Sequence, residues 1–314
     1  MFGTFMSRIL LSVCERPIVR STRRIRWAAI PLAATLVLAL SACTDQELAG
    51  YLPGFVSGAS PVTNHTQLIT DFWVNSWIVL LAIGFITWGL LLWSMVVYRR
   101  RKTDTGLPVQ LRYNMPIEIL FTVIPFILII GLFALTARDE AVIEQRFDNP
   151  DVTIQAFGKQ WAWDFNYTNE DVYYSGIQVQ PDLSADAPQG SILESSIPTL
   201  YLPVGKKVEI QLNARDVIHS FWVIDFLYKK DMIPGKTNYM SIIPEREGTY
   251  AGKCAELCGE FHSQMLFQVK VVSQEEYDAY IQSLRDQGFE GQLGTEYDRN
   301  SNQANVVASA TESK

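Results

Sequence analysis

The chain has 314 residues, of which 48% are hydrophobic and 19% charged, and its formal net charge is -7. This balance fits neither a disordered chain nor an ordinary soluble globule, so part of the apolar residues is expected to be embedded in a membrane. The length allows one to three domains.

The first 42 residues have the pattern of an export signal. Arginines between Arg16 and Arg26 precede the uncharged stretch 27–42, which is too short to cross a bilayer comfortably but is typical of a signal h-region. This stretch ends in "LSAC", which resembles the lipobox of bacterial lipoproteins, so Cys43 is expected to carry a lipid and to become the first mature residue. The alternative is a plain signal peptide in which Cys43 is incidental.

Loss of residues 1–42 would make the remaining chain strongly acidic. Lys+Arg would fall from 26 to 20 and Asp+Glu from 33 to 32, which changes the net charge from -7 to -12. A strongly acidic protein favours a basic partner, and no nucleic-acid partner is expected.

An exterior leader, 43–72, is followed by a predicted transmembrane helical hairpin, 73–138. Its two apolar spans, 77–97 and 119–137, are near the length that crosses a bilayer of ~30 Å. The connecting loop begins "RRRK" at Arg99, whereas the leader from Thr44 to Phe72 contains no Lys or Arg. By the positive-inside rule the loop is cytoplasmic, and both mature termini lie on the exterior, periplasmic-side face of a bacterial cell membrane.

Residues 139–272 are predicted to form an exterior all-β sandwich or barrel. Short β-rich runs alternate with turn signals and begin at residues 152, 161, 172, 198, 208, 219, 237, 248 and 264. A polar, flexible-looking excursion at 182–197 interrupts them. In the C-terminal region, 273–314, an amphipathic helix is expected at 273–287 with Ser273 as its N-cap, and the polar tail beyond Gly288 is expected to be disordered.

The segment "KCAELCGEFHSQM", 253–265, gathers thiol, imidazole and thioether groups in a chain with 4 cysteines and 3 histidines. Cys254 and Cys258 could form a disulfide in an oxidising compartment. His262 and Met265 follow on the same loop, and His219 begins a distant β-run. Thiolate, imidazole and thioether together favour copper, and two bridging thiolates would suit two coppers. Structural zinc is the alternative metal, although a thioether is a poor zinc ligand.

On these residues the chain resembles subunit II of the haem-copper cytochrome c oxidases, in an actinobacterial-like form. The family pattern of a His and a distant Cys-x₃-Cys-x₃-His-x₂-Met is met by His219, Cys254, Cys258, His262 and Met265. The resemblance implies a cupredoxin-like exterior domain with a dinuclear copper (CuA) centre. It also implies that the carbonyl of Glu256 is a weak copper ligand and that its side chain helps to hold a magnesium ion shared with subunit I.

The resemblance implies further functional residues. Trp161, in "GKQWAW", matches the electron entry point from cytochrome c, although a Trp in a β-run is by itself more often a core residue. Asp216 matches an acidic position that contacts cytochrome c, whereas a second such position is Asn166 here, with Asp164 close by. Glu118 matches the position at the mouth of the K proton pathway of subunit I. The alternative is that its carboxylate has no such role and merely extends from the end of the membrane helix to water.

The expected function is therefore that of an electron-transferring subunit. Electrons would pass from cytochrome c through the copper centre to the haem of subunit I, where oxygen is reduced to water and protons are pumped. Subunits I and III and a separate cytochrome are the expected partners, since the chain has no haem-attachment motif "CxxCH". The 182–197 excursion resembles an actinobacterial insertion and is expected to dock a membrane-bound cytochrome, within a supercomplex.

Other classes of protein fit less well. A quinol oxidase subunit II lacks the copper ligands, and nitrous oxide reductase carries a large further domain and no such hairpin. A copper-binding lipoprotein or chaperone without oxidase partners is the remaining alternative; it would explain Cys43 and the thiols but not the sequence around Trp161, Glu118 and His219.

Overall fold

The computed structural model describes residues 61–299, apart from 102, 108–109, 111 and 189. The predicted signal peptide 1–42, the lipid site Cys43, most of the leader and residues 300–314 of the tail lie outside the described residues. Expectations for those segments therefore stay predictions.

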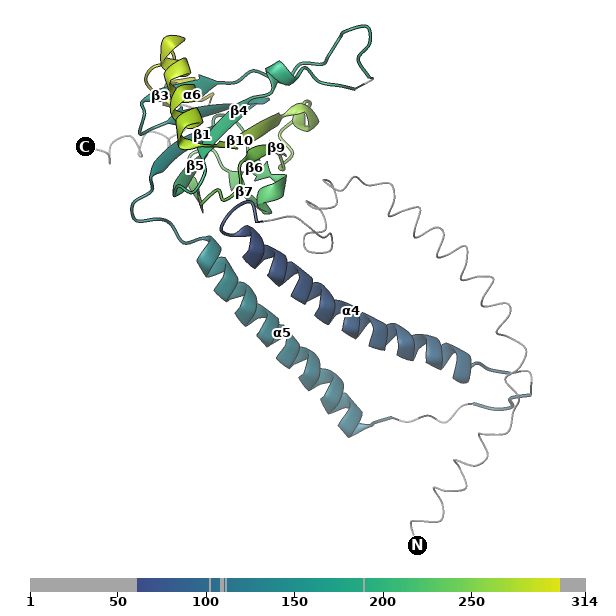
Figure 1. Cartoon of the computed structure of the whole chain (residues 1–314). Helices are drawn as coiled ribbons and strands as arrows, with labels where there is room; N and C mark the ends of the chain where they lie inside the picture. The colour runs from purple at the N-terminus through teal and green to yellow at the C-terminus, as the bar shows by residue number, and fades with distance from the viewer. Residues whose placement is uncertain (1–60, 102, 108–109, 111, 189, 300–314) are drawn as a thin grey trace. The chain divides into compact units, whose positions relative to one another are not determined.

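Two long helices precede the β domain: α4, Thr66–Val97, and α5, Met115–Ile143 (Figure 1). Both are long and apolar enough to cross a membrane, judged by length and composition. The predicted spans 77–97 and 119–137 lie inside them. The helices run further because polar turns at their ends continue the same backbone hydrogen bonding, as when the backbone N–H of Glu118 donates to the Asn114 carbonyl.

The β domain is a sandwich of two five-stranded sheets, with strand orders β3-β2-β1-β5-β8 and β4-β10-β9-β6-β7. Its architecture confirms the predicted all-β domain. The strands are β1 (Val152–Lys159), β2 (Ala162–Tyr167), β3 (Val172–Ser175), β4 (Thr199–Pro203), β5 (Val208–Ala214), β6 (His219–Val223), β7 (Tyr228–Met232), β8 (Asn238–Ile242), β9 (Gly248–Cys254) and β10 (Leu266–Val272).

Each of the predicted β-runs overlaps one of these strands, and β7 was missed. Its sequence, "YKKDM", carries three charged residues in the middle, so it lacks the apolar alternation that marks a strand. Charged side chains are tolerated there because β7 is an edge strand, paired only with β6 in its sheet.

Aromatic side chains fill the space between the sheets. Trp163 is fully buried, and its ring centroid lies 5.8 Å from that of Phe221 and 4.7 Å from that of Phe267. Such edge-on and tilted pairs are favourable beyond the area that they bury. They fix β2, β6 and β10 relative to one another, and the last two of these strands border the candidate site.

The predicted C-terminal helix is α6, Gln274–Asp286, and the Ser273 hydroxyl accepts a hydrogen bond from the Glu276 N–H at 3.2 Å, as expected of an N-cap. The predicted disorder beyond Gly288 is wrong for residues 288–299. Leu293 is buried, and its backbone is held by the Asn166 side chain in two hydrogen bonds of 3.0 Å. Sequence composition missed this because the segment is mostly polar and is held largely by hydrogen bonds to residues far away in the chain.

The predicted insertion, 182–197, lies in the connection from β3 to β4, which extends from the sandwich as a long loop (Figure 1). Its base is closed by an antiparallel bridge between Pro181 and Ile192 and by a 3.0 Å hydrogen bond from the Asp182 N–H to the Ser191 carbonyl. The residues just before it reach the candidate site, since the Gln178 side chain donates to Gln264 at 3.1 Å.

His65 is 5% exposed at the start of α4. Its Nε2 lies 2.9 Å from the Ser241 carbonyl on β8, which joins the helix start to the sandwich. The burial of His65 was not visible in the sequence because its partner is 176 residues away.

The free energy of unfolding is expected to fall at acid pH because of His65. Burial lowers the pKa of His65, although its hydrogen bond to the Ser241 carbonyl acts in the opposite direction. In the unfolded chain the His65 side chain has an ordinary pKa of about 6.5, so it binds a proton at a higher pH than it does in the folded protein. Protonation therefore favours the unfolded state, and the free energy of unfolding falls as the pH drops below about 6.5. Urea unfolding between pH 7.5 and 5.5 should show a shallower pH slope for His65→Gln than for the natural chain; equal slopes would contradict the assignment.

Candidate metal centre

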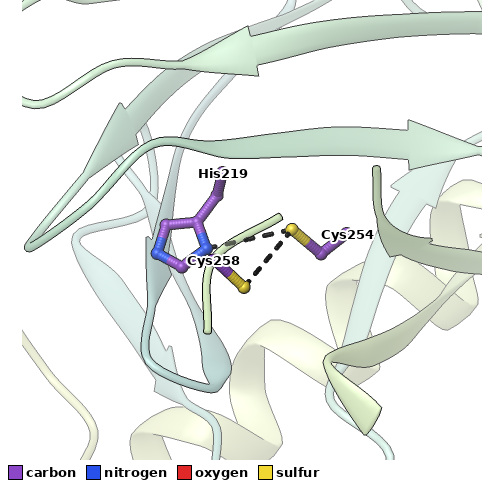
Figure 2. Close-up of side chains that lie close together, drawn as sticks. All are labelled: His219, Cys254 and Cys258. Carbon is purple, nitrogen blue, oxygen red and sulfur yellow. Dashed lines mark hydrogen bonds between the residues drawn. The ribbon is translucent and has the colours of Figure 1, made fainter. Parts of the chain in front are cut away.

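The candidate ligands meet because of how three neighbouring strands pair. His219 is the first residue of β6 and Cys254 is the last residue of β9, and these strands are antiparallel with Phe221 opposite Cys254. The loop from β9 to β10 then carries Cys258, His262 and Met265. Residues 35 or more positions apart in the sequence thereby reach one end of the sheet, where His219 and the two thiols point toward one another (Figure 2).

The donor atoms of these side chains are close together. The ligand atoms of His219, Cys254 and Cys258 all lie within 4.8 Å of one another. The Cys258 sulfur lies 3.6 Å from Nδ1 of His262 and 3.7 Å from the Met265 sulfur. All five predicted ligands thus belong to one cluster.

The carbonyl group of Glu256 joins the cluster as well, at 3.2 Å from the Cys254 sulfur. The side chain of Glu256 is exposed, so only its backbone faces the site.

The two cysteines are free and their sulfur atoms are 3.9 Å apart, so the structure does not contain the alternative disulfide. Burial raises the pKa of Cys254, but hydrogen bonds with His219 and the Ser220 backbone outweigh this effect, and the net pKa lies below the ordinary value. Burial and the neighbouring Cys254 raise the pKa of Cys258 to about 12. In the metal-free protein the second thiol therefore keeps its proton, and a bound cation would favour its ionisation.

Asp216 holds His219 in place. Nε2 of His219 donates to Oδ1 of Asp216 at 2.8 Å, which leaves Nδ1 facing the thiols at 3.9 Å from the Cys254 sulfur. The same carboxylate accepts hydrogen bonds from the Val217 and Gln160 N–H groups, both at 2.7 Å. Carboxylates that fix the tautomer of a metal-binding histidine act in this way.

These contacts leave little exposed surface at the positions where the resemblance implied cytochrome docking. Asp216 is 7% exposed, so its carboxylate supports the site and offers little surface to another protein. Asp164 and Asn166 are also buried, because Asp164 pairs with Lys159 and Arg215, and Asn166 binds the C-terminal segment. The sequence alone could not separate a surface carboxylate from a buried one at these positions.

A glycine makes room for the histidine ring. An added Cβ on Gly158, in β1, would lie 2.9 Å from Cγ and Cδ2 of His219, closer than real Cβ contacts come. Because His219 is fully buried and bonded to Asp216, its ring has little freedom to move away.

Gly158→Ala is expected to reduce the free energy of unfolding by about 1–3 kcal/mol, the usual cost of overpacking, and to disturb the metal spectrum of the site. Urea unfolding and a copper titration would measure both effects. Gly131→Ala, where nothing lies within 4 Å of the added Cβ, is the control and should change neither. An unchanged Gly158→Ala protein would mean that the ring is not confined.

Trp161 lies against the cysteine loop. Its ring makes an edge-on contact with Phe261 at 4.9 Å between centroids, and an added Cβ on Gly259 would lie 3.1 Å from the indole. Trp161 packs against the core but is only partly buried. It therefore has features of a core residue and also of a surface residue.

Glu118 is not part of this cluster. It lies in the first turn of α5, and the helix continues 25 residues further to Ile143, about 37 Å along its axis. Its carboxylate accepts a hydrogen bond from the Asn114 N–H at 3.0 Å and thus caps the helix start.

Sequence reasoning missed one residue of the site, Gln160. Its side chain donates to the Cys258 carbonyl at 2.8 Å, while its backbone N–H donates to Asp216. The only signal was its position next to Trp161, since an amide side chain has no ligand-like pattern of its own.

The β-sandwich has a cupredoxin-like fold, it follows two candidate membrane spans, and the thiol, imidazole and thioether groups at one end form a cluster that could hold a metal. The family model described as cytochrome c oxidase subunit II, periplasmic domain, matches residues 152–272. The probable cytochrome c oxidase subunit 2 of Streptomyces avermitilis is 42% identical over 283 residues, which cover 83% of this chain and 87% of that protein.

Cytochrome c oxidase subunit 2 of Mycobacterium bovis is 33% identical over 309 residues, with 85% of this chain and 83% of that protein covered. The crystal structure of the periplasmic domain of cytochrome oxidase subunit II from Bradyrhizobium japonicum shares 27% identity and a TM-score of 0.38, over 44% of this chain and 96% of that one. This chain belongs to the cytochrome c oxidase subunit II family, and it is therefore a subunit of a haem-copper oxidase. Its β-sandwich corresponds to the exterior domain of that subunit.

Proposed function

We propose that the cluster binds the dinuclear copper (CuA) centre of the oxidase and that this centre receives electrons from cytochrome c and delivers them to the haem of subunit I. The observation that carries the proposal is the convergence of two free thiols, two imidazoles and a buried thioether at one end of the sandwich. Met265 is fully buried there, and a thioether favours copper over zinc.

The copper pair would be held by the thiolates of Cys254 and Cys258 and by His219, His262, Met265 and the Glu256 carbonyl. When bound, it would supply one-electron chemistry, and rigid ligands would keep the rearrangement that accompanies the transfer small. The contribution of the protein is rigidity: His219, Cys254 and Met265 are at most 4% exposed, and Asp216 fixes the ring of His219.

Trp161 is the proposed entry point for electrons, supported by its contact with the cysteine loop and by its partial exposure. The exposed carboxylate of Glu256 is proposed to bind the magnesium ion shared with subunit I. Glu118 is proposed to lie at the mouth of the K proton pathway, since it is half-buried at the helix end that is predicted to be cytoplasmic. Oxygen reduction and proton pumping would take place in subunit I, and subunit III would complete the complex.

The loop 182–197 is proposed to dock the cytochrome donor, which would be membrane-bound and joined with the oxidase in a supercomplex. Because the Asp182 N–H and the Ser191 carbonyl are bonded across its base, residues 183–190 can be removed and the ends joined by two glycines. The shortened protein should keep its copper spectrum and be reduced more slowly by that cytochrome, by about tenfold if docking supplies about 1.4 kcal/mol. Reduction at the natural rate in a stopped-flow measurement would contradict this role.

Lipidation of Cys43 is proposed as well, as an anchor in addition to the helical hairpin, with the N-terminus on the exterior face. Mass spectrometry of the purified chain would show whether its first residue is a lipidated Cys43 or an unmodified residue.

An electron paramagnetic resonance spectrum of the copper-loaded chain in detergent tests the proposal directly. One unpaired electron shared by two equivalent copper nuclei is expected to give a seven-line hyperfine pattern. A four-line pattern from a single copper, or bound zinc with no signal, would mean that the cluster serves another purpose.

A further inference from the structure

The C-terminal segment 291–299, here called the C-terminal strap, is held by two buried side chains. Asn166 is fully buried and binds both the N–H and the carbonyl group of Leu293. Arg215 is 3% exposed and donates to the Gly294 carbonyl at 2.8 Å, to the Leu293 carbonyl at 3.3 Å and to the Asp298 carboxylate at 3.0 Å. Buried polar groups of this kind are costly to leave without partners, so the strap is a fixed part of the domain.

The strap is attached directly beside the support of His219. The Arg299 N–H donates to the Arg215 carbonyl at 2.9 Å, and the next residue along the chain is Asp216, whose carboxylate receives the His219 hydrogen bond. Lys159, Gln160, Asp216, Tyr297 and Arg299 line a small cavity of about 160 Å³ between the strap and this loop. The strap and Asp216 therefore border the same cavity.

Gln160 links the strap to both halves of the site. Its Oε1 accepts a hydrogen bond from the Arg299 guanidinium at 3.1 Å, and its Nε2 donates to the Cys258 carbonyl at 2.8 Å. Its backbone N–H donates to Asp216 at 2.7 Å. One residue thus touches the strap, the cysteine loop and the carboxylate that orients His219.

We propose that Gln160 and Arg299 are positioning residues, through which the C-terminal strap holds the Cys258 loop and His219 at the separation that the metal pair requires. An amide can make both contacts at once only if Oε1 faces a donor and Nε2 faces an acceptor, and Arg299 supplies that donor. With Arg299 fixing the amide, the Cys258 carbonyl keeps its partner and the cysteine loop cannot swing outward. The inference rests on the proposed copper function, but its mechanical part concerns the metal-free chain.

Labelling of the metal-free full-length chain with a maleimide, followed by peptide mass spectrometry that resolves each cysteine, tests the mechanical part. Arg299→Gln and Gln160→Leu should each speed labelling of Cys258 by about tenfold, because the cysteine loop opens more often. The expected size follows the 10–100-fold change in metal affinity that loss of an outer contact of a metal ligand typically causes. Arg285→Gln is the matched control, since Arg285 donates to the Glu170 carbonyl and has no contact with Gln160. Removal of residues 300–314, which leaves the strap intact, is the second control.

The copper-loaded proteins provide the second measurement. Both variants should bind copper about tenfold more weakly and broaden the hyperfine pattern, while Arg285→Gln should match the natural chain. Natural labelling rates together with natural spectra in both variants would overturn the proposal. If the natural chain itself binds no copper pair, the proposed function fails, whereas the labelling rates still decide whether the strap holds the cysteine loop.

A loss of fold would be recognised separately. Arg299 is an exposed contact, so Arg299→Gln should leave the urea midpoint unchanged. Faster labelling of Cys258 at an unchanged midpoint supports positioning; faster labelling that occurs only with a lowered midpoint in both variants would mean general destabilisation and would contradict it.

Discussion

Cys258→Ser is expected to abolish the shared-electron copper spectrum and to reduce electron delivery by more than about 100-fold. The Cys258 sulfur lies near the donor atoms of Cys254, His262 and Met265, so its loss would remove one of the two thiolates proposed to hold the copper pair. Changes to residues that merely support metal ligands already cost about 10–100-fold, and loss of a bridging ligand should exceed that range. Copper content, the electron paramagnetic resonance spectrum and oxidase turnover with reduced cytochrome c would measure the effect.

Cys14→Ser is the matched control, because it makes the same chemical change in the predicted signal sequence. It should leave copper content and turnover of the assembled enzyme unchanged. A Cys258→Ser protein that retained two coppers and the shared spectrum would exclude the bridging role. Retention of turnover with loss of the spectrum would instead show that electrons reach subunit I by another route.

Arg215→Met is expected to lower the free energy of unfolding by about 3 kcal/mol. The Arg215 guanidinium and the Asp164 carboxylate are both nearly inaccessible to solvent and are 3.1 Å apart. Removing one partner of a buried ion pair typically costs 3–5 kcal/mol because the other charge is left in a poor environment. Lys159 still pairs with Asp164 at 2.6 Å, which places the expected loss at the lower end of that range. Urea unfolding of the full chain in detergent would measure it.

Replacing both charged residues separates the effect of the ion pair on stability from the effect of the contacts between Arg215 and the C-terminal strap. Arg215→Met combined with Asp164→Leu should recover part of the lost stability, because the charges then left alone, Lys159 and Asp298, lie nearer to water than Asp164 does. Arg285→Met, on a side chain that donates a hydrogen bond to the Glu170 carbonyl, should cost less than about 1 kcal/mol. A loss of similar size in Arg215→Met and Arg285→Met would contradict the importance of the buried pair.

Local sequence patterns were sufficient to predict a helix or strand wherever the pattern of apolar residues alone determined it. The apolar spans predicted both helices, and alternation of apolar residues predicted every strand except β7, whose edge position permits its charges. The Ser273 cap was also correct, because capping involves residues only three positions apart. Disorder after Gly288 was wrong because that segment is fixed by Asn166 and Arg215, which are more than 70 residues distant in the chain.

The sequence by itself was enough to predict which residues form the cluster, since the types and spacing of cysteine, histidine and methionine match the family pattern. Only the tertiary structure decided the surroundings of those ligands. It brought His219 to the thiols through the pairing of β6 with β9, turned Asp216 from an expected docking residue into the support of His219, and joined Gln160 to the C-terminal strap. These contacts depend on burial and on partners far along the chain, and neither composition nor spacing encodes them residue by residue.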